Sequence, residues 1–151
     1  MYISIPKPKN SITMSFKKVT VEATVNAPVD KVWKLWNDPE HIMKWNTASS
    51  DWHTTKSEVD LKPGGKFSSR MEAKDGSFGF DFAGVYDVIK PNQQIDYTMG
   101  DGRKVNNVFS SQGSSTKMTV TFDAENENPV EMQKGGWQAI LDSFKSYAEK
   151  K

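Results

Sequence analysis

The sequence predicts a single α+β domain in which antiparallel strands outnumber the helices and the longest helix comes last. Two patterns in the 151 residues carry this prediction. Between residues 50 and 124, six short stretches with strand character are separated by turn dipeptides, which is the spacing of an antiparallel meander. The final segment instead places its apolar residues at helical intervals.

The first predicted elements are a strand and a bent pair of short helices. Apolar and polar residues alternate over residues 19–25, which is the period of a strand with one buried face. Pro28 and Pro39 each open a helical pattern at a first-turn position, where the missing N–H does no harm. Asp38 is the expected cap of the second helix and, with Pro39, ends the first, so the two helices should meet at a bend.

Six further strands form the middle of the chain. They are predicted near residues 52–59, 66–73, 78–89, 94–99, 104–111 and 116–123. Dipeptides such as Asp75-Gly76 and Asp101-Gly102 separate them, because positive φ is cheap for glycine and tolerated by Asn and Asp. Such turns predict hairpins between neighbouring strands.

A long helix is predicted over about residues 129–149. Asn128, Pro129 and Glu131 are its expected cap, first-turn proline and reach-back carboxylate. At roughly 30 Å, this helix is long enough to lie across the concave face of a twisted sheet. Gly135 and Gly136 near its start predict either a close approach to the sheet or a ligand, or a kink.

Composition excludes several classes of function. The chain has 20 basic and 19 acidic residues, which gives no general attraction to nucleic acid. The absence of cysteine and the presence of only two histidines argue against thiol catalysis and a thiolate or three-histidine metal site. No apolar run is long enough for a membrane span or a signal-peptide core. We therefore expect a cytoplasmic domain over residues 16–151 that follows a flexible leader, residues 1–15.

Five segments together carry a resemblance to a known family. They are NAPVDKVWKLWNDPEHIMKW (26–45), PGGKFSSRM (63–71), FAGVYDVIKPNQQIDYTMGDGR (82–103), STKMTVTF (115–122) and GGWQAILDSFKSYAE (135–149). In this order they resemble the helix-grip fold of the START-like (SRPBCC, birch-pollen-allergen-like) superfamily, and within it the family named for the activator of heat-shock protein 90 ATPase homologue. The resemblance implies a curved antiparallel sheet wrapped around the last helix, with an elongated apolar cavity between them. It also implies binding of hydrophobic small molecules or stimulation of a chaperone ATPase.

Alternation along the strands selects the side chains that would face such a cavity. The predicted ligand-binding residues are Trp36, Trp45, Trp52, Phe67, Met71, Phe80, Phe82, Tyr97, Asn107, Phe109, Met118, Trp137, Leu141 and Phe144. Aromatic and methionine side chains dominate this set and adapt to varied apolar shapes. The alternative interpretation is that they fill a solid core.

Some side chains have a more specific expected position. Trp45 and Trp52 are predicted at the entrance of the cavity, where an indole offers apolar area and one donor. Phe78 shares the inward face of its predicted strand with Phe80. Asn107, if it faces inward, needs a partner, for which a buried water or a polar group of the ligand is expected.

Three functions remain open at this point. The leading hypothesis is binding of a lipid-, polyketide- or flavonoid-like molecule by a monomer or homodimer, with no catalytic residue, cofactor or metal. The second is a stress-related interaction module whose partner is a heat-shock chaperone. The third is a cavity enzyme of the cyclase or hydrolase type, which requires His41, His53 or Asp81 to point into the cavity. A bulge at Gly84 would turn Asp81 inward.

Overall fold

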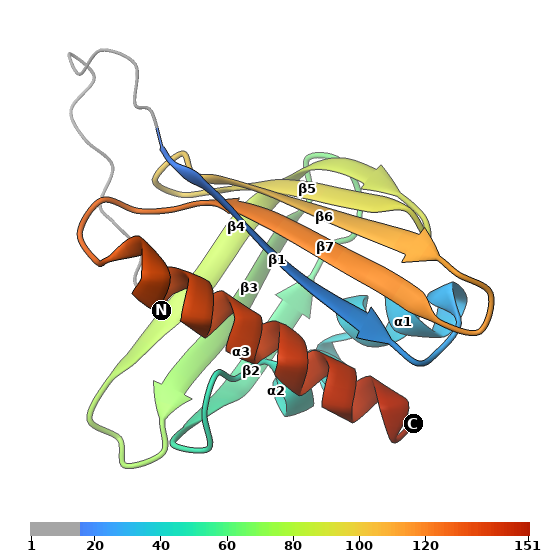
Figure 1. The fold of residues 1–151 in the computed structure, drawn as a ribbon. Coiled ribbons are helices and arrows are strands. Elements are labelled where there is room, and N and C mark those ends of the chain that lie inside the picture. Colours follow the sequence, from blue (N-terminus) through green and yellow to red (C-terminus); the bar gives the residue numbers. More distant parts are fainter. Residues whose placement is uncertain (1–15) are drawn as a thin grey trace.

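A curled sheet of seven antiparallel strands holds one long helix in the computed structural model, which describes residues 16–151 (Figure 1). The strands are β1 (Lys18–Val25), β2 (Trp52–Val59), β3 (Lys66–Ala73), β4 (Gly79–Lys90), β5 (Gln94–Met99), β6 (Lys104–Ser111) and β7 (Thr116–Asp123). The helices are α1 (Val29–Asn37), α2 (Pro39–Trp45) and α3 (Val130–Glu149). This is the expected α+β helix-grip architecture. The predicted leader lies outside the described residues.

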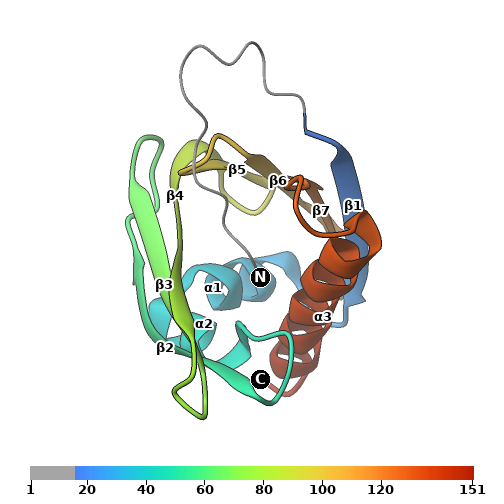
Figure 2. The same cartoon turned by 90° about the vertical axis from the view of Figure 1, so that its left-hand side faces the viewer.

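The strand order β1-β7-β6-β5-β4-β3-β2 joins β2 to β7 by hairpins and brings β1 to the far edge beside β7. Figure 2 shows the sheet bent into a wall of β2, β3 and β4 and a second wall that ends at β1. Helix α3 lies across the open side between these walls, and α1 and α2 lie near one end. The sheet and α3 therefore enclose an interior that can be packed solid or left partly hollow.

A bulge in β4 accompanies the bend of the sheet. The register with β5 shifts between Tyr86 and Val88, so the extra residue is Asp87. The bulge considered at Gly84 is absent, because Gly84 pairs in regular register with Met99. A bulge locally increases strand bending. Gly84 has a different role: a Cβ there would lie 2.9 Å from the ring of Phe67. Glycine at this position lets the phenyl ring lie against β4.

The starts of α1 and α2 follow the sequence prediction with one difference. Asp38 caps α2 by accepting a hydrogen bond from the Glu40 N–H at 3.1 Å, and Pro39 is the first helical residue. Pro28 stands one position earlier than expected, as the N-cap of α1. In both cases proline occupies a site whose N–H has no partner within the helix.

The predicted cap of α3 is wrong. Pro129 occupies the N-cap, and no side chain caps the helix. Instead, the buried carboxylate of Glu125 accepts a hydrogen bond from the Asn128 N–H at 2.7 Å. The side chain of Gln133 reaches back, donating to the carbonyls of Glu125 and Asn128 and accepting from the Glu125 N–H. Gln133, rather than Glu131, thus ties the preceding loop to the helix.

Glu149 ties the other end of α3 to the loop after β1. Its carboxylate accepts hydrogen bonds from Lys145 Nζ at 2.6 Å and from the Asn26 N–H at 2.8 Å. Lys145, followed by Asn26, holds the pKa of this carboxyl below its ordinary value of 4.5. A carboxyl whose pKa is depressed by folding stabilises the fold above its unfolded pKa, and this contribution is lost as the pH falls through the folded pKa.

We therefore expect Glu149→Gln to lower the melting temperature slightly near neutral pH and to have a vanishing effect well below pH 4.5. Thermal unfolding of both proteins across this pH range measures the difference. A difference that stayed constant down to acidic pH would show that the charge of Glu149 is not what matters.

Candidate functional site

Two adjoining cavities lie between the sheet and α3. The inner chamber has a volume of about 90 Å³ and the outer chamber about 370 Å³. Trp137 and Ile140 of α3 line both, so the chambers meet at this pair of side chains. The hollow expected from the sequence is therefore present, although its deep part is small.

The structure divides the predicted ligand-binding residues into three groups. The inner chamber is lined by Trp36, Trp45, Phe67, Phe82, Tyr97, Asn107, Trp137 and Leu141. The outer chamber is lined by Trp52, Met71, Phe80 and, again, Trp137. Phe109, Met118 and Phe144 line neither chamber and are buried in the hydrophobic core. These three residues therefore fill the core, as the alternative interpretation of the sequence proposed.

Aromatic rings build the walls of the inner chamber. Phe67 on β3 lies 4.7 Å from the ring of Tyr97 and 5.2 Å from that of Tyr86, centroid to centroid. Trp137 lies flat on Phe122, with ring centroids 4.3 Å apart and planes 7° apart. No charged side chain lines this chamber. The described part of its wall therefore offers an apolar surface of defined shape and no counter-ion for a charged ligand.

Two polar side chains of the inner chamber, Asn107 and Ser69, already have protein partners. Asn107 faces inward as expected, and its Nδ2 donates to the Ile95 carbonyl at 3.1 Å. The partner of Nδ2 is thus a backbone carbonyl and not the expected water or ligand group. The Ser69 hydroxyl is 3.2 Å from that of Ser57. These bonds hold the polar side chains against the sheet.

The outer chamber has a mixed wall beside the start of α3. Trp52 and Phe80 contribute aromatic rings, whereas Arg103 and Glu125 contribute charged groups. Arg103 is only 1% exposed, and its Nε donates to Asp101 at 2.7 Å. Arg103 was not among the predicted site residues, although it directly precedes β6 and has the same inward alternation as Asn107 on that strand. A bound molecule would meet polar groups here and apolar groups deeper in.

Apolar side chains exposed to solvent flank the outer chamber. Phe78 directly precedes β4 and is 60% exposed, so the prediction that it faces the interior is wrong. The centroid of its ring lies 6.0 Å from that of Trp52. Met132, 64% exposed, lies on α3 and lines the outer chamber. Gly136 also lines it, and a Cβ there or at Gly135 would meet nothing within 4 Å. Close approach of the helix to the sheet therefore does not explain the two glycines.

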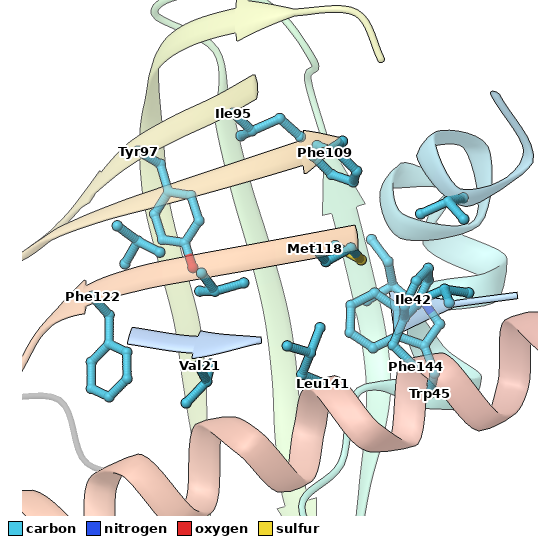
Figure 3. Close-up of a cluster of buried hydrophobic side chains, with 14 of the residues drawn as sticks. Val21, Ile42, Trp45, Ile95, Tyr97, Phe109, Met118, Phe122, Leu141 and Phe144 are labelled. Atoms are coloured by element: carbon cyan, nitrogen blue, oxygen red, sulfur yellow. The ribbon is translucent and has the colours of Figure 1, made fainter. Parts of the chain in front are cut away.

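Trp45 is not at the entrance, and that prediction is wrong. Its indole is buried and donates to the Leu35 carbonyl at 3.0 Å. It stacks on Trp36 at 4.7 Å and meets the edge of Phe144 at 5.0 Å, which joins α1, α2 and α3. Figure 3 shows Trp45 and Phe144 side by side. Trp45 is thus primarily a packing residue, with one side at the wall of the inner chamber.

The three residues on which the enzyme hypothesis depends line neither chamber. His53 and Asp81 are exposed, and Asp81 lies 3.6 Å from Arg70. His41 is half-buried, with its Nδ1 at 2.5 Å from the Tyr147 hydroxyl. Within residues 16–151, no three His, Asp or Glu side chains are grouped so that they would hold a metal ion. In the same part of the chain, no helix has the length and apolar character that a membrane crossing requires.

Comparison with known proteins supports this architecture. The model of the family described as "Activator of Hsp90 ATPase homolog 1-like protein" matches residues 26–149. The solution structure of the AHSA1-like protein from Aeromonas hydrophila is 46% identical with a TM-score of 0.84, over 89% of this chain and 93% of that one. Chr148 from Cytophaga hutchinsonii is 57% identical with a TM-score of 0.77, over 88% and 92% of the two chains. CV1439 from Chromobacterium violaceum, at 20% identity and a TM-score of 0.79 over 88% and 98%, shares the fold. A search of curated proteins found no match.

Proposed function

Because this chain belongs to the family of Activator of Hsp90 ATPase homolog 1-like proteins, whose fold commonly binds hydrophobic ligands, we propose that it binds a hydrophobic small molecule in the two chambers. The observation that carries this proposal is the pair of adjoining cavities under α3, with an aromatic inner wall. Lipid-, polyketide- and flavonoid-like molecules are the candidate classes.

The chamber volumes limit how such a molecule would fit. An apolar cavity of ~150 Å³ is known to accept benzene. The inner chamber, at about 90 Å³, would accept at most one small ring or a short chain without movement of its walls. The remainder of a larger ligand would pass Trp137 and Ile140 into the outer chamber, where Arg103 and Glu125 are available to polar groups.

A ligand panel tests the proposal. Trp36, Trp45 and Trp137 border the inner chamber, so ligand binding should change the intrinsic fluorescence in a saturable way. The same ligands should raise the melting temperature, because binding only to the folded state stabilises it by about 2.7 kcal/mol at a concentration of 100 Kd. A panel of fatty acids, polyketides and flavonoids that changed neither quantity would contradict the proposal.

Ile140→Trp should block the junction between the chambers. Ile140 is half-buried and lines both, so the larger indole would occupy the passage. We expect calorimetric titration to show at least about fivefold weaker binding of any ligand from the panel, because overpacking costs about 1–3 kcal/mol. Ser146→Trp is the matched control, since Ser146 is exposed on the same helix and lines neither chamber. Equal affinities of the two variants would argue against ligand binding at this junction.

A second candidate function is stimulation of a heat-shock chaperone ATPase, as the family description states for its namesake. The observation that favours it is the exposure of Phe78 and Met132, which present apolar surface beside the outer chamber. The ATPase rate of heat-shock protein 90 from the same organism, with and without this protein, tests it. We expect stimulation that falls in a Phe78→Ser/Met132→Ser variant; an unchanged rate with the native chain would exclude this function.

A further inference from the structure

Two tyrosine hydroxyls at the inner chamber have no protein partner. Tyr97 on β5 and Tyr86 on β4 are opposite each other in the strand register, and both line this chamber. Their side chains are deeply enclosed, since the residues are 9% and 6% exposed. Among residues 16–151, neither hydroxyl has a hydrogen-bond partner. Figure 3 shows the hydroxyl of Tyr97 directed away from β5 toward the space between the sheet and α3.

These hydroxyls border open space and are not sealed in the core. Within the described part of the chain, every fully enclosed side-chain nitrogen or oxygen atom has a hydrogen-bond partner. The phenol oxygens, which have none, are therefore accessible, and the inner chamber is the cavity that both residues line. Asn107 and Ser69, in contrast, already bond to protein groups there. Of the hydroxyl groups among the described residues that line this chamber, the two phenols are the ones left to donate to a ligand.

Both phenols stay protonated under ordinary conditions. Burial raises the pKa of Tyr97 far above its usual value of 10, and the neighbouring Tyr86 raises it further. Burial, and then the charge of Asp60, raises the pKa of Tyr86 in the same way. A protonated phenol donates a hydrogen bond from its O–H. The matching group on a ligand is therefore an acceptor.

The acceptor must also be uncharged. No charged side chain of the described residues lines the inner chamber, and Arg103, whose charge acts on Tyr97, is already paired with Asp101. A carboxylate would therefore lose its hydration without gaining a counter-ion of its own. A carbonyl oxygen loses less on leaving water and offers two lone pairs, enough for two donors. Tyr86 and Tyr97 lie opposite each other on neighbouring strands, and both line the chamber into which such a carbonyl would bind.

We infer that Tyr97, with Tyr86 beside it, donates a hydrogen bond to an uncharged carbonyl oxygen at the buried end of the ligand. The ligand is then a ketone, ester, lactone or quinone with an apolar body. This inference rests on the proposed function, because it assigns the polar group of a molecule bound in the inner chamber.

Acetophenone and ethylbenzene provide a matched pair of probes, because they share one small ring and nearly one shape and differ in the carbonyl oxygen. Their dissociation constants for the full-length protein are measured by NMR titration. Relative to ethylbenzene, Tyr97→Phe should weaken acetophenone binding about threefold to tenfold. Tyr86→Phe should change the same ratio in the same direction. Tyr147→Phe is the control, since its hydroxyl contacts His41 and it lines neither chamber.

The outcomes separate this inference from the proposed function. If both probes bind and the ratio of their constants is the same in the native, Tyr97→Phe and Tyr86→Phe proteins, the tyrosines do not recognise the carbonyl, while ligand binding stands. If the native protein binds neither probe but binds a member of the ligand panel, this inference is contradicted while ligand binding stands; if it binds neither the probes nor any member of the panel, both proposals are contradicted. A readout without substitution is the Cζ chemical shift of Tyr97, which should move with acetophenone in a way that ethylbenzene does not reproduce. Equal movement with both probes would overturn the inference even if the variants failed to fold.

Discussion

Phe144→Ala should lower the free energy of unfolding by about 3–5 kcal/mol. The Phe144 side chain is fully buried on α3 and meets the indoles of Trp36 at 4.9 Å and Trp45 at 5.0 Å. This three-ring cluster is where α3 packs against α1 and α2. Its removal would leave a cavity that the stacked indoles cannot fill without breaking the bond from Trp45 to the Leu35 carbonyl. Urea unfolding measures the loss.

Phe78→Ala is the matched control for this prediction. The same atoms are removed, but Phe78 is 60% exposed, so little apolar area returns to water on unfolding. We expect a loss below about 1 kcal/mol. Similar losses at both positions would mean that the three-ring cluster does not hold the helices together.

The strands were predictable where alternation and turn chemistry agree. The bounds of β5, β6 and β7 coincide with those expected, because one face of each strand is buried and turn dipeptides separate them. At β4 the prediction starts one residue early. Alternation with Phe80 placed Phe78 inside, whereas Phe78 lies before the strand begins and its ring is exposed. Periodicity cannot locate a strand end that falls between two aromatic residues.

The details of the site depend on contacts between segments far apart in the sequence. Trp45 and Trp52 both flank a polar stretch, yet only Trp45 meets a carbonyl and a second indole that bury it. Whether aromatic side chains leave a hollow depends on how Phe67, Trp137 and their neighbours pack across the interior. Alternation selected inward side chains correctly in most cases, but it carries no information on the volume left between them.

Charge was the misleading signal at Arg103. Arg103 directly precedes β6 and continues the inward alternation of Val105 and Asn107, but an arginine is rarely buried unless it is paired. Its partner Asp101 belongs to the turn before β6, in which the Arg103 N–H also donates to Asp101 at 3.1 Å. The turn was predicted from Asp101-Gly102. The second role of Asp101, as the counter-ion of Arg103, was visible only in three dimensions.

This buried pair gives the second large expected effect. Asp101→Ala should lower the free energy of unfolding by about 3–5 kcal/mol, because it removes one member of a buried ion pair and leaves the guanidinium less well compensated. Glu58→Ala is the control: Glu58 pairs with Lys56 at 3.1 Å, but both side chains are largely exposed. Such surface pairs contribute about 0–1 kcal/mol. Chemical unfolding of the two variants provides the comparison.

A second substitution shows whether the loss comes from the buried charge or from the turn. When Arg103→Met is added to Asp101→Ala, the guanidinium that lost Asp101 is gone, and methionine retains much of the apolar stem. If the charge is responsible, the double variant should be more stable than Asp101→Ala alone, because an apolar pair avoids the desolvation of the arginine. If the double variant is as unstable as the single one or worse, the main contribution of Asp101 is to the turn before β6, through the hydrogen bond from the backbone of residue 103.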